Sequence, residues 1–241
     1  MRKGDRRRRD IMLAAEKLFY EKGYEHTSVQ DMLDAMDLSK GGFYHHFESK
    51  QSVMVAICEE KIQQMYDSAI QMARFDSATA VEKLNELFRR ANLLSHSDEN
   101  YIQLMLHAAY AQDSYMLRAK MQEVTLQKLV PVVSDVVSQG LLSGEFYTRY
   151  PDLVGEQLVT LWLNLLDIAM QTTIRALEEP EEVIGVIDRI NAFRTSMELI
   201  LNAPYGSIKL CEAEDILRTV RRLTVLRRMQ DKAEKAEKEV V

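Results

Sequence analysis

The sequence predicts an all-α protein, because apolar residues recur at helical spacing along the chain and few residues interrupt that pattern. Apolar residues make up 46% of the 241 positions, whereas the chain contains only nine glycines and four prolines. Few β-branched runs lie between turn signals, where strands would place them. The length allows a small domain followed by a larger one. We therefore expect helices joined by short turns.

The first 36 residues predict two helices separated by a glycine. Apolar residues of the segment 5–22 fall on one helical face, and Gly23 should end that helix. A second, shorter helix should then extend to about Met36. Either of two residues could be its N-cap, because each is followed three positions later by a candidate capping partner. The two pairs are Thr27 with Gln30 and Ser28 with Asp31.

A tight turn and a third short helix should follow. The turn occupies residues 37–38, Ser39 can cap a helix that runs to about Phe47, and Ser49 can cap a fourth helix. Two short helices joined by a tight turn make a helix-turn-helix, whose second helix enters the major groove of DNA. Longer helices are expected further on, over residues 78–94, 98–111, 113–139, 152–177, 181–202 and 212–237, with a break over 140–151.

The formal net charge of −6 conceals a basic N-terminal end. Residues 1–50 carry ten Lys and Arg against nine Asp and Glu, whereas residues 51–241 carry 21 against 28. Within residues 2–9, six basic side chains oppose Asp5 alone, a density that suits a phosphate backbone. The alternative is a solvated basic tail without a partner.

Other classes of protein receive little support. Cys58 and Cys211 lie far apart without Cys/His metal spacing, which indicates a reducing cytosol, no metal and no cofactor. The longest apolar stretch, 158–168, is shorter than the roughly 20 residues of a membrane span, and charges interrupt any signal-peptide core near Met1. No phosphate loop or nucleophile motif indicates an enzyme. We therefore expect a cytoplasmic protein that starts near Met1, contacts no membrane and has no catalytic residues.

The segment 39–47 has the composition of a helix that reads DNA. It offers a cation, two glycines that permit close backbone approach, and three aromatic side chains with hydrogen-bonding edges: Lys40, Gly41, Gly42, Tyr44, His45 and His46. Phe43 and Phe47 should anchor this helix inward. Core packing is the alternative for the whole aromatic cluster, and it suits the two phenylalanines best.

Several short elements stand in a characteristic order between residues 8 and 56: Gly23-Tyr24, Thr27-Ser28-Val29-Gln30-Asp31-Met32, Ala35, Ser39-Lys40-Gly41-Gly42-Phe43-Tyr44-His45-His46-Phe47 and Ser49-Lys50. This order resembles the DNA-binding domain of the TetR family of one-component transcriptional regulators. The resemblance implies contacts with DNA, mostly with phosphates, by Lys40, Gly41, Tyr44, His45, His46 and Lys50. We add Ser39 and Gly42 to the predicted interface.

Gln30 stands where some family members read a base, and a glutamine there could bond bidentately to adenine. It could equally be the capping partner of Thr27.

Three positions depart from the family pattern. Asp37 replaces the usual turn glycine, but aspartate tolerates the left-handed conformation, so the turn should survive. Gly42 replaces a residue that is often threonine, which puts base reading there in doubt. Leu33 replaces a common alanine and implies that the two short helices pack slightly apart or rotated.

For the rest of the chain the resemblance implies a helical effector-binding and dimerisation domain, whose last two core helices pair with those of a second subunit. Apolar residues nearly encircle the segment 158–168 and form a stripe over 183–200. Burial in a dimer interface explains this pattern, and a large monomeric core is the alternative. An apolar pocket for a small-molecule effector could include Tyr101, Met105, Tyr110, Trp162 and Met170, with His107, Asn164 and Asp167 as further candidates, although core packing could account for each.

These observations predict a helix-turn-helix DNA-binding domain at 1–52 and a ligand-binding and dimerisation domain at 53–241. An extra helix at about 212–237 could dock on its own domain, extend the dimer or meet an acidic surface. The expected function is transcription regulation by a homodimer on a double-stranded DNA operator, as a repressor released by an unknown small-molecule effector. A helical adaptor that binds protein through its N-terminal domain is the alternative.

Overall fold

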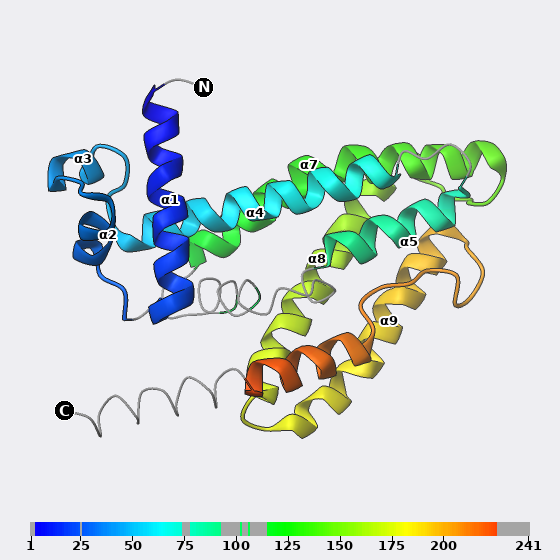
Figure 1. Cartoon of the computed structure of the whole chain (residues 1–241). Helices are drawn as coiled ribbons and strands as arrows, with labels where there is room; N and C mark the ends of the chain where they lie inside the picture. The colour runs from blue at the N-terminus through cyan, green and yellow to red at the C-terminus, as the bar shows by residue number, and fades with distance from the viewer. Residues whose placement is uncertain are drawn as a thin grey trace. The chain divides into compact units, whose positions relative to one another are not determined.

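Helices account for all the regular secondary structure in the described part of the chain, which is known from a computed structural model (Figure 1). The predicted all-α fold is therefore confirmed. The boundaries of most predicted helices lie within a few residues of the observed ones. The residues that the structure describes are 3–24, 26–73, 78–92, 102, 106 and 115–225.

The chain divides into two compact units. The first comprises Met1–Gln64 and Gln103–Met121, and the second comprises Met65–Ile102 and Gln122–Val241. The predicted boundary after residue 52 falls inside the first unit, so the division of function at that point stays a prediction.

The first unit contains a cluster of three helices and the beginning of a fourth. α1 packs against α2, and apolar side chains from all four helices are buried between them. This core includes Ile11, Phe19, Met32, Phe43, Phe47, Val53 and Ile57. The helices are α1 (Lys3–Lys22), α2 (Val29–Met36), α3 (Lys40–Tyr44) and α4 (Lys50–Ala73).

Two of the predicted helix boundaries in this unit are set by local hydrogen bonds. Gly23 has a φ of +81°, and its N–H donates to the carbonyl of Phe19 at 3.1 Å, so a left-handed glycine ends α1. At the start of α4, the backbone N–H of Ser49 donates to Ser52 Oγ and the N–H of Ser52 donates to Ser49 Oγ, both at 3.1 Å. The predicted cap at Ser49 is confirmed.

Asp37 lies in the turn between α2 and α3 with φ 48° and ψ 49°, in the left-handed region. Its backbone N–H points to the carbonyls of Leu33 and Asp34, so it ends α2 in the role that glycine usually has. The prediction that aspartate would preserve this turn is confirmed.

Asp37→Gly should raise the free energy of unfolding by about 0.5–1 kcal/mol, because glycine adopts the left-handed conformation without steric cost. Urea denaturation followed by circular dichroism would measure the difference. Asp37→Ala is the matched control and should lower stability, since alanine keeps the Cβ and loses the polar side chain. A glycine variant less stable than the parent would mean that the Asp37 carboxylate contributes more than its backbone conformation costs.

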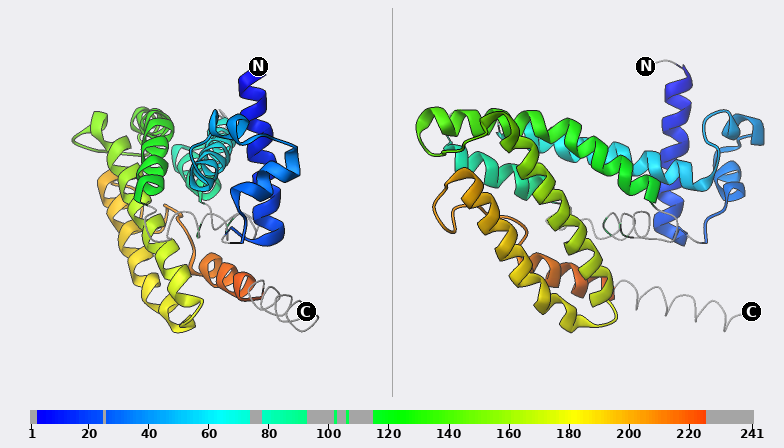
Figure 2. Two further views of the ribbon diagram at one scale, coloured as in Figure 1. Left: turned by 90° about the vertical axis from the view of Figure 1, so that its left-hand side faces the viewer. Right: turned by 180° about the vertical axis from the view of Figure 1, so that it is seen from behind.

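The second unit is also helical. α8 and α9 lie side by side and are joined by the short 3-10 helix η2 (Figure 2). Its elements are α5 (Ala80–Ala91), the greater part of α7 (Tyr115–Ser143), α8 (Pro151–Ala176), η2 (Pro180–Val183), α9 (Ile184–Leu201) and helical residues 213–225.

Three aromatic side chains meet in the core of the second unit. The Trp162 ring on α8 stacks on Phe88 of α5 with 5.7 Å between centroids, and it meets the ring of Tyr66 edge-on at 6.4 Å. The hydroxyl groups of Tyr66 and Thr125 are 2.7 Å apart and share a hydrogen bond. Burial raises the pKa of Tyr66 to about 12. Tyr66 is therefore un-ionised at neutral pH and serves as a packed, hydrogen-bonded core residue.

The prediction of a break beginning at Gly140 is wrong, because α7 continues to Ser143. A Cβ at Gly140 would lie 2.1 Å from Cδ2 of Phe146 and 2.9 Å from Cβ of Ala80. Glycine is needed there for close packing inside a helix. The chain turns at Gly144, where φ is +79°.

Side chains of α5 and α9 hold the segment that follows α9. Asn85 of α5 donates from Nδ2 to the carbonyl of Ser207 at 2.8 Å and accepts from the N–H of Lys209 at 2.7 Å. The buried carboxylate of Glu198 on α9 accepts from the N–H of Ile208 at 3.1 Å. These bonds satisfy backbone groups of a segment without regular structure.

The described part of the extra C-terminal helix, residues 213–225, buries one apolar face formed by Ile216, Val220 and Leu223. Of the roles considered for this helix, that burial favours docking on its own domain. The remainder of the predicted helix lies outside the described residues.

The two cysteines are free and buried, and burial raises the pKa of each thiol to about 12. Both thiols therefore remain protonated at neutral pH and are poor nucleophiles. Among the described residues, α8 is long and apolar enough to cross a membrane by length and composition, and 44% of its most apolar stretch is buried within the protein. The core helix of a globular protein meets the same criterion, so we attach no membrane role to α8.

Candidate nucleic-acid interface

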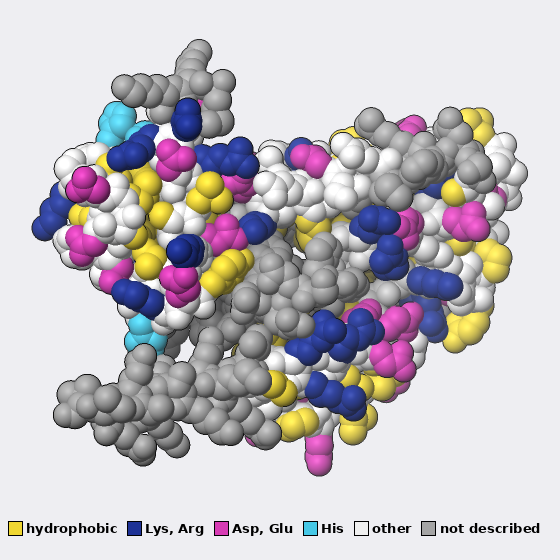
Figure 3. All heavy atoms as spheres, in the orientation of Figure 1, with side chains coloured by type: hydrophobic (Ala, Val, Ile, Leu, Met, Phe, Trp, Pro, Cys, Tyr) yellow, Lys and Arg dark blue, Asp and Glu magenta, His cyan; other side chains and the backbone are white. Residues whose placement is uncertain are grey.

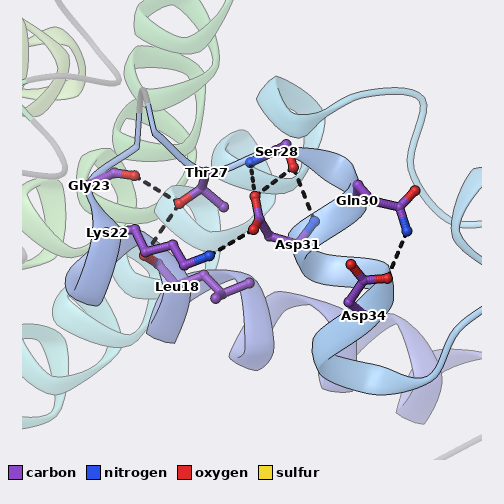
Figure 4. Close-up of polar contacts among 8 residues, drawn as sticks. All are labelled: Leu18, Lys22, Gly23, Thr27, Ser28, Gln30, Asp31 and Asp34. Atoms are coloured by element: carbon purple, nitrogen blue, oxygen red, sulfur yellow. Dashed lines mark hydrogen bonds and ion pairs between the residues drawn. The ribbon is translucent and has the colours of Figure 1, made fainter. Parts of the chain in front are cut away.

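A network of polar contacts joins the end of α1 to the start of α2 (Figure 4). Ser28 caps α2, because its hydroxyl accepts from the N–H of Asp31 at 3.1 Å while the Asp31 carboxylate accepts from the N–H of Ser28 at 2.7 Å. Lys22 Nζ donates to the second oxygen of Asp31 at 2.7 Å. The hydrogen bonds from Lys22 and Ser28 hold the pKa of Asp31 well below its usual range. The first helix of the helix-turn-helix is thus fixed to α1.

Thr27 is buried and its hydroxyl donates to the carbonyl of Gly23 at 2.8 Å. Because that hydroxyl serves the turn that precedes α2, the interpretation of Gln30 as its capping partner is wrong. Gln30 lies on the exposed side of α2, and its Nε2 donates to Asp34 Oδ1 at 2.7 Å (Figure 4). Its role in base reading stays a prediction.

The first turn of α3 faces solvent. Ser39 caps it, as predicted, by accepting from the N–H of Gly42 at 3.1 Å, and Lys40 is exposed. A Cβ at Gly41 would meet no atom within 4 Å, so another molecule can approach this backbone closely. A Cβ at Gly42 would lie 2.7 Å from Cδ1 of Leu38, so Gly42 allows α3 to pack on the preceding turn.

The aromatic cluster of residues 43–47 divides into a buried and an exposed part. α3 ends at Tyr44, so the prediction that this helix runs to about Phe47 is wrong. Phe43 and Phe47 are buried, as predicted, with 6.1 Å between ring centroids. Tyr44 is 56% exposed and meets Phe43 edge-on at 5.4 Å. His45 is exposed and His46 is half-buried, with 4.9 Å between their rings. The exposed edges of Tyr44, His45 and His46 can donate hydrogen bonds to an anionic partner.

Lys50 has a different environment from the exposed residues of α3. Its Nζ donates to the carbonyl of Tyr24 at 2.8 Å and lies 4.3 Å from the centroid of the Tyr24 ring. The Tyr24 ring in turn packs on Phe19. The fold thus engages Lys50 in joining the start of α4 to the end of α1, and its contact with DNA stays a prediction.

The surface of the first unit carries both signs of charge, and Figure 3 shows basic and acidic side chains intermixed on it. Several lysines form ion pairs, including Lys22 with Asp31 and Lys61 with Glu16. Such pairs leave little net charge for a polyanion to attract. The structure gives Lys40 no partner among the described residues, so its charge is available to a ligand.

The segment that forms the helix-turn-helix matches a known family of proteins in sequence. Residues 11–57 match the family of bacterial regulatory proteins designated tetR, over a segment that reaches from α1 into α4 and includes the whole helix-turn-helix. Residues 11–57 are thus similar to the N-terminal DNA-binding domain of the TetR family. The predicted resemblance over residues 8–56 is confirmed by this match.

Relatives of this chain include the HTH-type transcriptional repressor KstR2 of Rhodococcus jostii. The two sequences are 32% identical over 93 residues, which are 38% of this chain and 46% of that protein. The chain spans between about a quarter and a half of the length of the first curated relatives that it matches.

Solved structures of TetR-family proteins share the fold along most of the chain. A putative TetR-family regulator from Mesorhizobium loti superposes with a TM-score of 0.53 at 19% identity, over 94% of this chain and 98% of that one. SmeT, the repressor of the Stenotrophomonas maltophilia multidrug efflux pump SmeDEF, gives 0.54 at 18% identity, over 86% and 95%. The predicted succession of an N-terminal helix-turn-helix and a larger helical domain is confirmed at the level of the fold.

The candidate effector residues are only partly described. Tyr101, Met105, Tyr110 and His107 lie outside the described residues. Trp162 and Met170 are buried in α8, whereas Asn164 is exposed and donates from Nδ2 to the carbonyl of Thr160 at 3.0 Å. Asn164 therefore does not contribute to an interior pocket within the chain, because it lies on the outer face of its helix. The effector pocket stays a prediction.

The two helices expected to form a dimer interface expose apolar side chains. On α8, Leu158 and Leu165 are buried, whereas Leu153 is exposed. On α9, Ile184 and Leu199 are 71% and 76% exposed. Large apolar side chains exposed in this number on two adjacent helices are typical of a surface that another protein covers.

Sequence reasoning missed three contacts that position side chains of this helix-turn-helix domain. Asp34 holds Gln30, Tyr24 holds Lys50, and Arg8 lies against Phe47. The Gln30 and Asp34 pair could have been found from its spacing of four residues on a helix. The other two contacts join distant segments, for which the sequence carries no local signal.

Proposed function

We propose that this protein is a transcription regulator that binds double-stranded DNA with sequence preference and inserts α3 into the major groove. The observation that carries the proposal is the exposed first turn of α3, where Lys40, the open Gly41 backbone and Tyr44 share one surface segment. The capped helix α2, bound to α1 through Lys22 and Asp31, supports it. A helix-turn-helix requires this combination of a rigid support and an exposed second helix.

The mode of regulation is repression in this proposal. Binding near a promoter blocks polymerase without a dedicated activating surface, and related proteins such as KstR2 are named as repressors. The protein acts as a cytoplasmic homodimer that pairs through the exposed apolar side chains of α8 and α9. Such a dimer carries two copies of α3, which match two half-sites about 34–36 Å apart. A small molecule that favours a differently spaced dimer would weaken binding to the operator. The chain has no catalytic role in this scheme.

Selection of bound duplexes from a random pool, followed by sequencing, tests the proposed function. We expect enrichment of a motif with two related half-sites, as a symmetric dimer requires. The quadruple change of Lys40, Tyr44, His45 and His46 to alanine should abolish enrichment and leave the circular dichroism spectrum unchanged. Recovery of no motif by the unmodified chain would contradict DNA recognition and support the adaptor interpretation.

Gln30→Ala should relax preference at one base position in each half-site by about 1–3 kcal/mol if the glutamine reads adenine. Thermal stability should change little, because Ser28 and Asp31 cap α2 without Gln30. Affinities for the selected motif and its single-base variants would give the measurement. Asp34→Ala, which removes the carboxylate that accepts from Gln30 Nε2 at 2.7 Å, is the matched control and should retain the base preference. Equal preference in the parent and Gln30→Ala would contradict base reading.

A further inference from the structure

The arginines in the first turns of α1 occupy different environments. Arg9 Nη2 lies 3.6 Å from Glu60 Oε1, which makes an ion pair with α4. The Arg8 guanidinium carbon lies 4.9 Å from the centroid of the Phe47 ring. Arg6 and Arg7 are exposed, and the structure gives neither of them a partner among the described residues. Two of the four cations are thus engaged by the fold and two are available.

Arg8 ends a row of aromatic contacts that joins the end of α3 to the segment after it. Phe47 packs on Phe43 at 6.1 Å, and Phe43 meets the exposed Tyr44 at 5.4 Å. The guanidinium group over Phe47 is held by a cation–π interaction, and Arg8 Nη1 also donates to Met12 Sδ at 3.4 Å. Arg8 therefore ties the N-terminal turns of α1 to the segment that directly follows α3, the helix proposed to enter the groove.

We propose that Arg6 and Arg7 bind phosphates of the same DNA that α3 enters, and that Arg8 is a positioning residue that holds them beside it. This inference rests on the proposed function. Arg6 and Arg7 precede Arg8 by two residues and one, so a helical rise of about 1.5 Å per residue keeps them within about 3 Å of it along the axis of α1. Around that axis they lie about 200° and 100° from Arg8, so their long side chains extend from the same turn to other sides of the helix. An unpaired guanidinium presents a planar fork of donors that matches a phosphate.

Charge distribution supports DNA as the occupant of this surface. Residues 51–241 carry 28 acidic against 21 basic side chains, and many basic groups of the first unit are paired. An acidic protein that approaches DNA needs unpaired cations on the unit that binds it. Within the described part of the chain Arg6 and Arg7 have no acidic partner, whereas Arg9 forms an ion pair with Glu60.

The salt dependence of DNA affinity tests the role of Arg6 and Arg7 in the full-length chain. For the double variant Arg6→Ala/Arg7→Ala, the slope of log affinity against log salt should flatten by about two per protomer, one for each phosphate that an arginine no longer neutralises. Affinity should fall on the order of tenfold per phosphate near ~0.1 M salt, equally for the selected motif and an unrelated duplex. Arg9→Ala, which removes the same charge from the same turn, is the matched control and should keep the parent slope.

A mutant cycle tests Arg8 as a positioning residue. Arg8→Met keeps the apolar stem and removes the guanidinium, so it should weaken binding and flatten the slope as the double variant does. Added to Arg6→Ala/Arg7→Ala, it should cause little further loss, because the groups that it positions are already absent. Arg8→Lys keeps a cation over Phe47 and should restore most of the affinity. Melting temperatures of all variants would show whether the domain remains folded.

The possible results separate the two proposals. A parental slope in Arg6→Ala/Arg7→Ala would overturn the inference and make these arginines a solvated surface, even if the parent chain selects a DNA motif. Losses from Arg8→Met that add fully to those of the double variant would overturn the positioning role. A parent chain that binds no duplex selectively would overturn the proposed function and, with it, this inference.

Discussion

Trp162→Ala should lower the free energy of unfolding of the second unit by about 3–5 kcal/mol, the range observed when a large aromatic side chain is removed from a core. Trp162 is 1% exposed and packs between Phe88 and Tyr66. Its removal would leave a cavity bordered by rings from α4 and α5. Urea denaturation followed by circular dichroism is the appropriate measurement, because the variant loses the only tryptophan.

Trp162→Phe is the matched control for this change. It keeps an aromatic ring beside Phe88 and should cost well under half as much as alanine. A loss below about 1 kcal/mol for Trp162→Ala would show that the site is loosely packed, as the predicted effector pocket requires. The parent protein offers a direct test of the pocket, because the fluorescence of Trp162 would respond to a bound apolar ligand if Trp162 lines it.

The helices could be predicted because their signals are local. Ser39 and Ser49 each precede a helix that they cap, and Gly23 follows the helix that it ends. The choice between Thr27 and Ser28 could not be made from spacing alone, because both have a capping partner three residues later. The structure decides it through the contact of Thr27 with the preceding turn.

The predicted break at Gly140 fails for a different reason. Glycine favours turns, but at Gly140 it admits the ring of Phe146 and the side chain of Ala80. A glycine at a close contact and a glycine at a turn look alike in a sequence. The neighbours that decide between them are brought together only by the tertiary fold.

The candidate interface was predicted well in composition and less well in geometry. The exposure of Lys40, Tyr44 and His45 agrees with the expectation for a helix that reads DNA. The contact of Lys50 with Tyr24 was not foreseen, because it joins residues 26 positions apart. The sequence around a lysine at the start of a helix does not indicate whether its ammonium group will contact a carbonyl, an aromatic ring or a phosphate.

Gly155→Ala should lower the free energy of unfolding of the second unit by about 1–2 kcal/mol. A Cβ at Gly155 on α8 would lie 2.0 Å from Ser134 Oγ and 2.9 Å from Ser134 Cα on α7. The hydroxyl can rotate away, but the backbone atom can retreat only if the two helices separate. Overpacking of this kind costs roughly 1–3 kcal/mol and outweighs the roughly 1 kcal/mol by which alanine favours a helix.

Gly185→Ala is the matched control, because a Cβ at this glycine of α9 would meet no atom within 4 Å. It should leave stability unchanged or raise it by up to about 1 kcal/mol, since only helix propensity acts there. Ser134→Gly should recover part of the loss in Gly155→Ala, because it removes the hydroxyl and Cβ but not the backbone Cα. Chemical denaturation of the two single variants and the double variant would measure this coupling. Additive effects of the changes at 134 and 155 would show that α7 and α8 do not meet at these residues, and the close helix contact would have to be rejected.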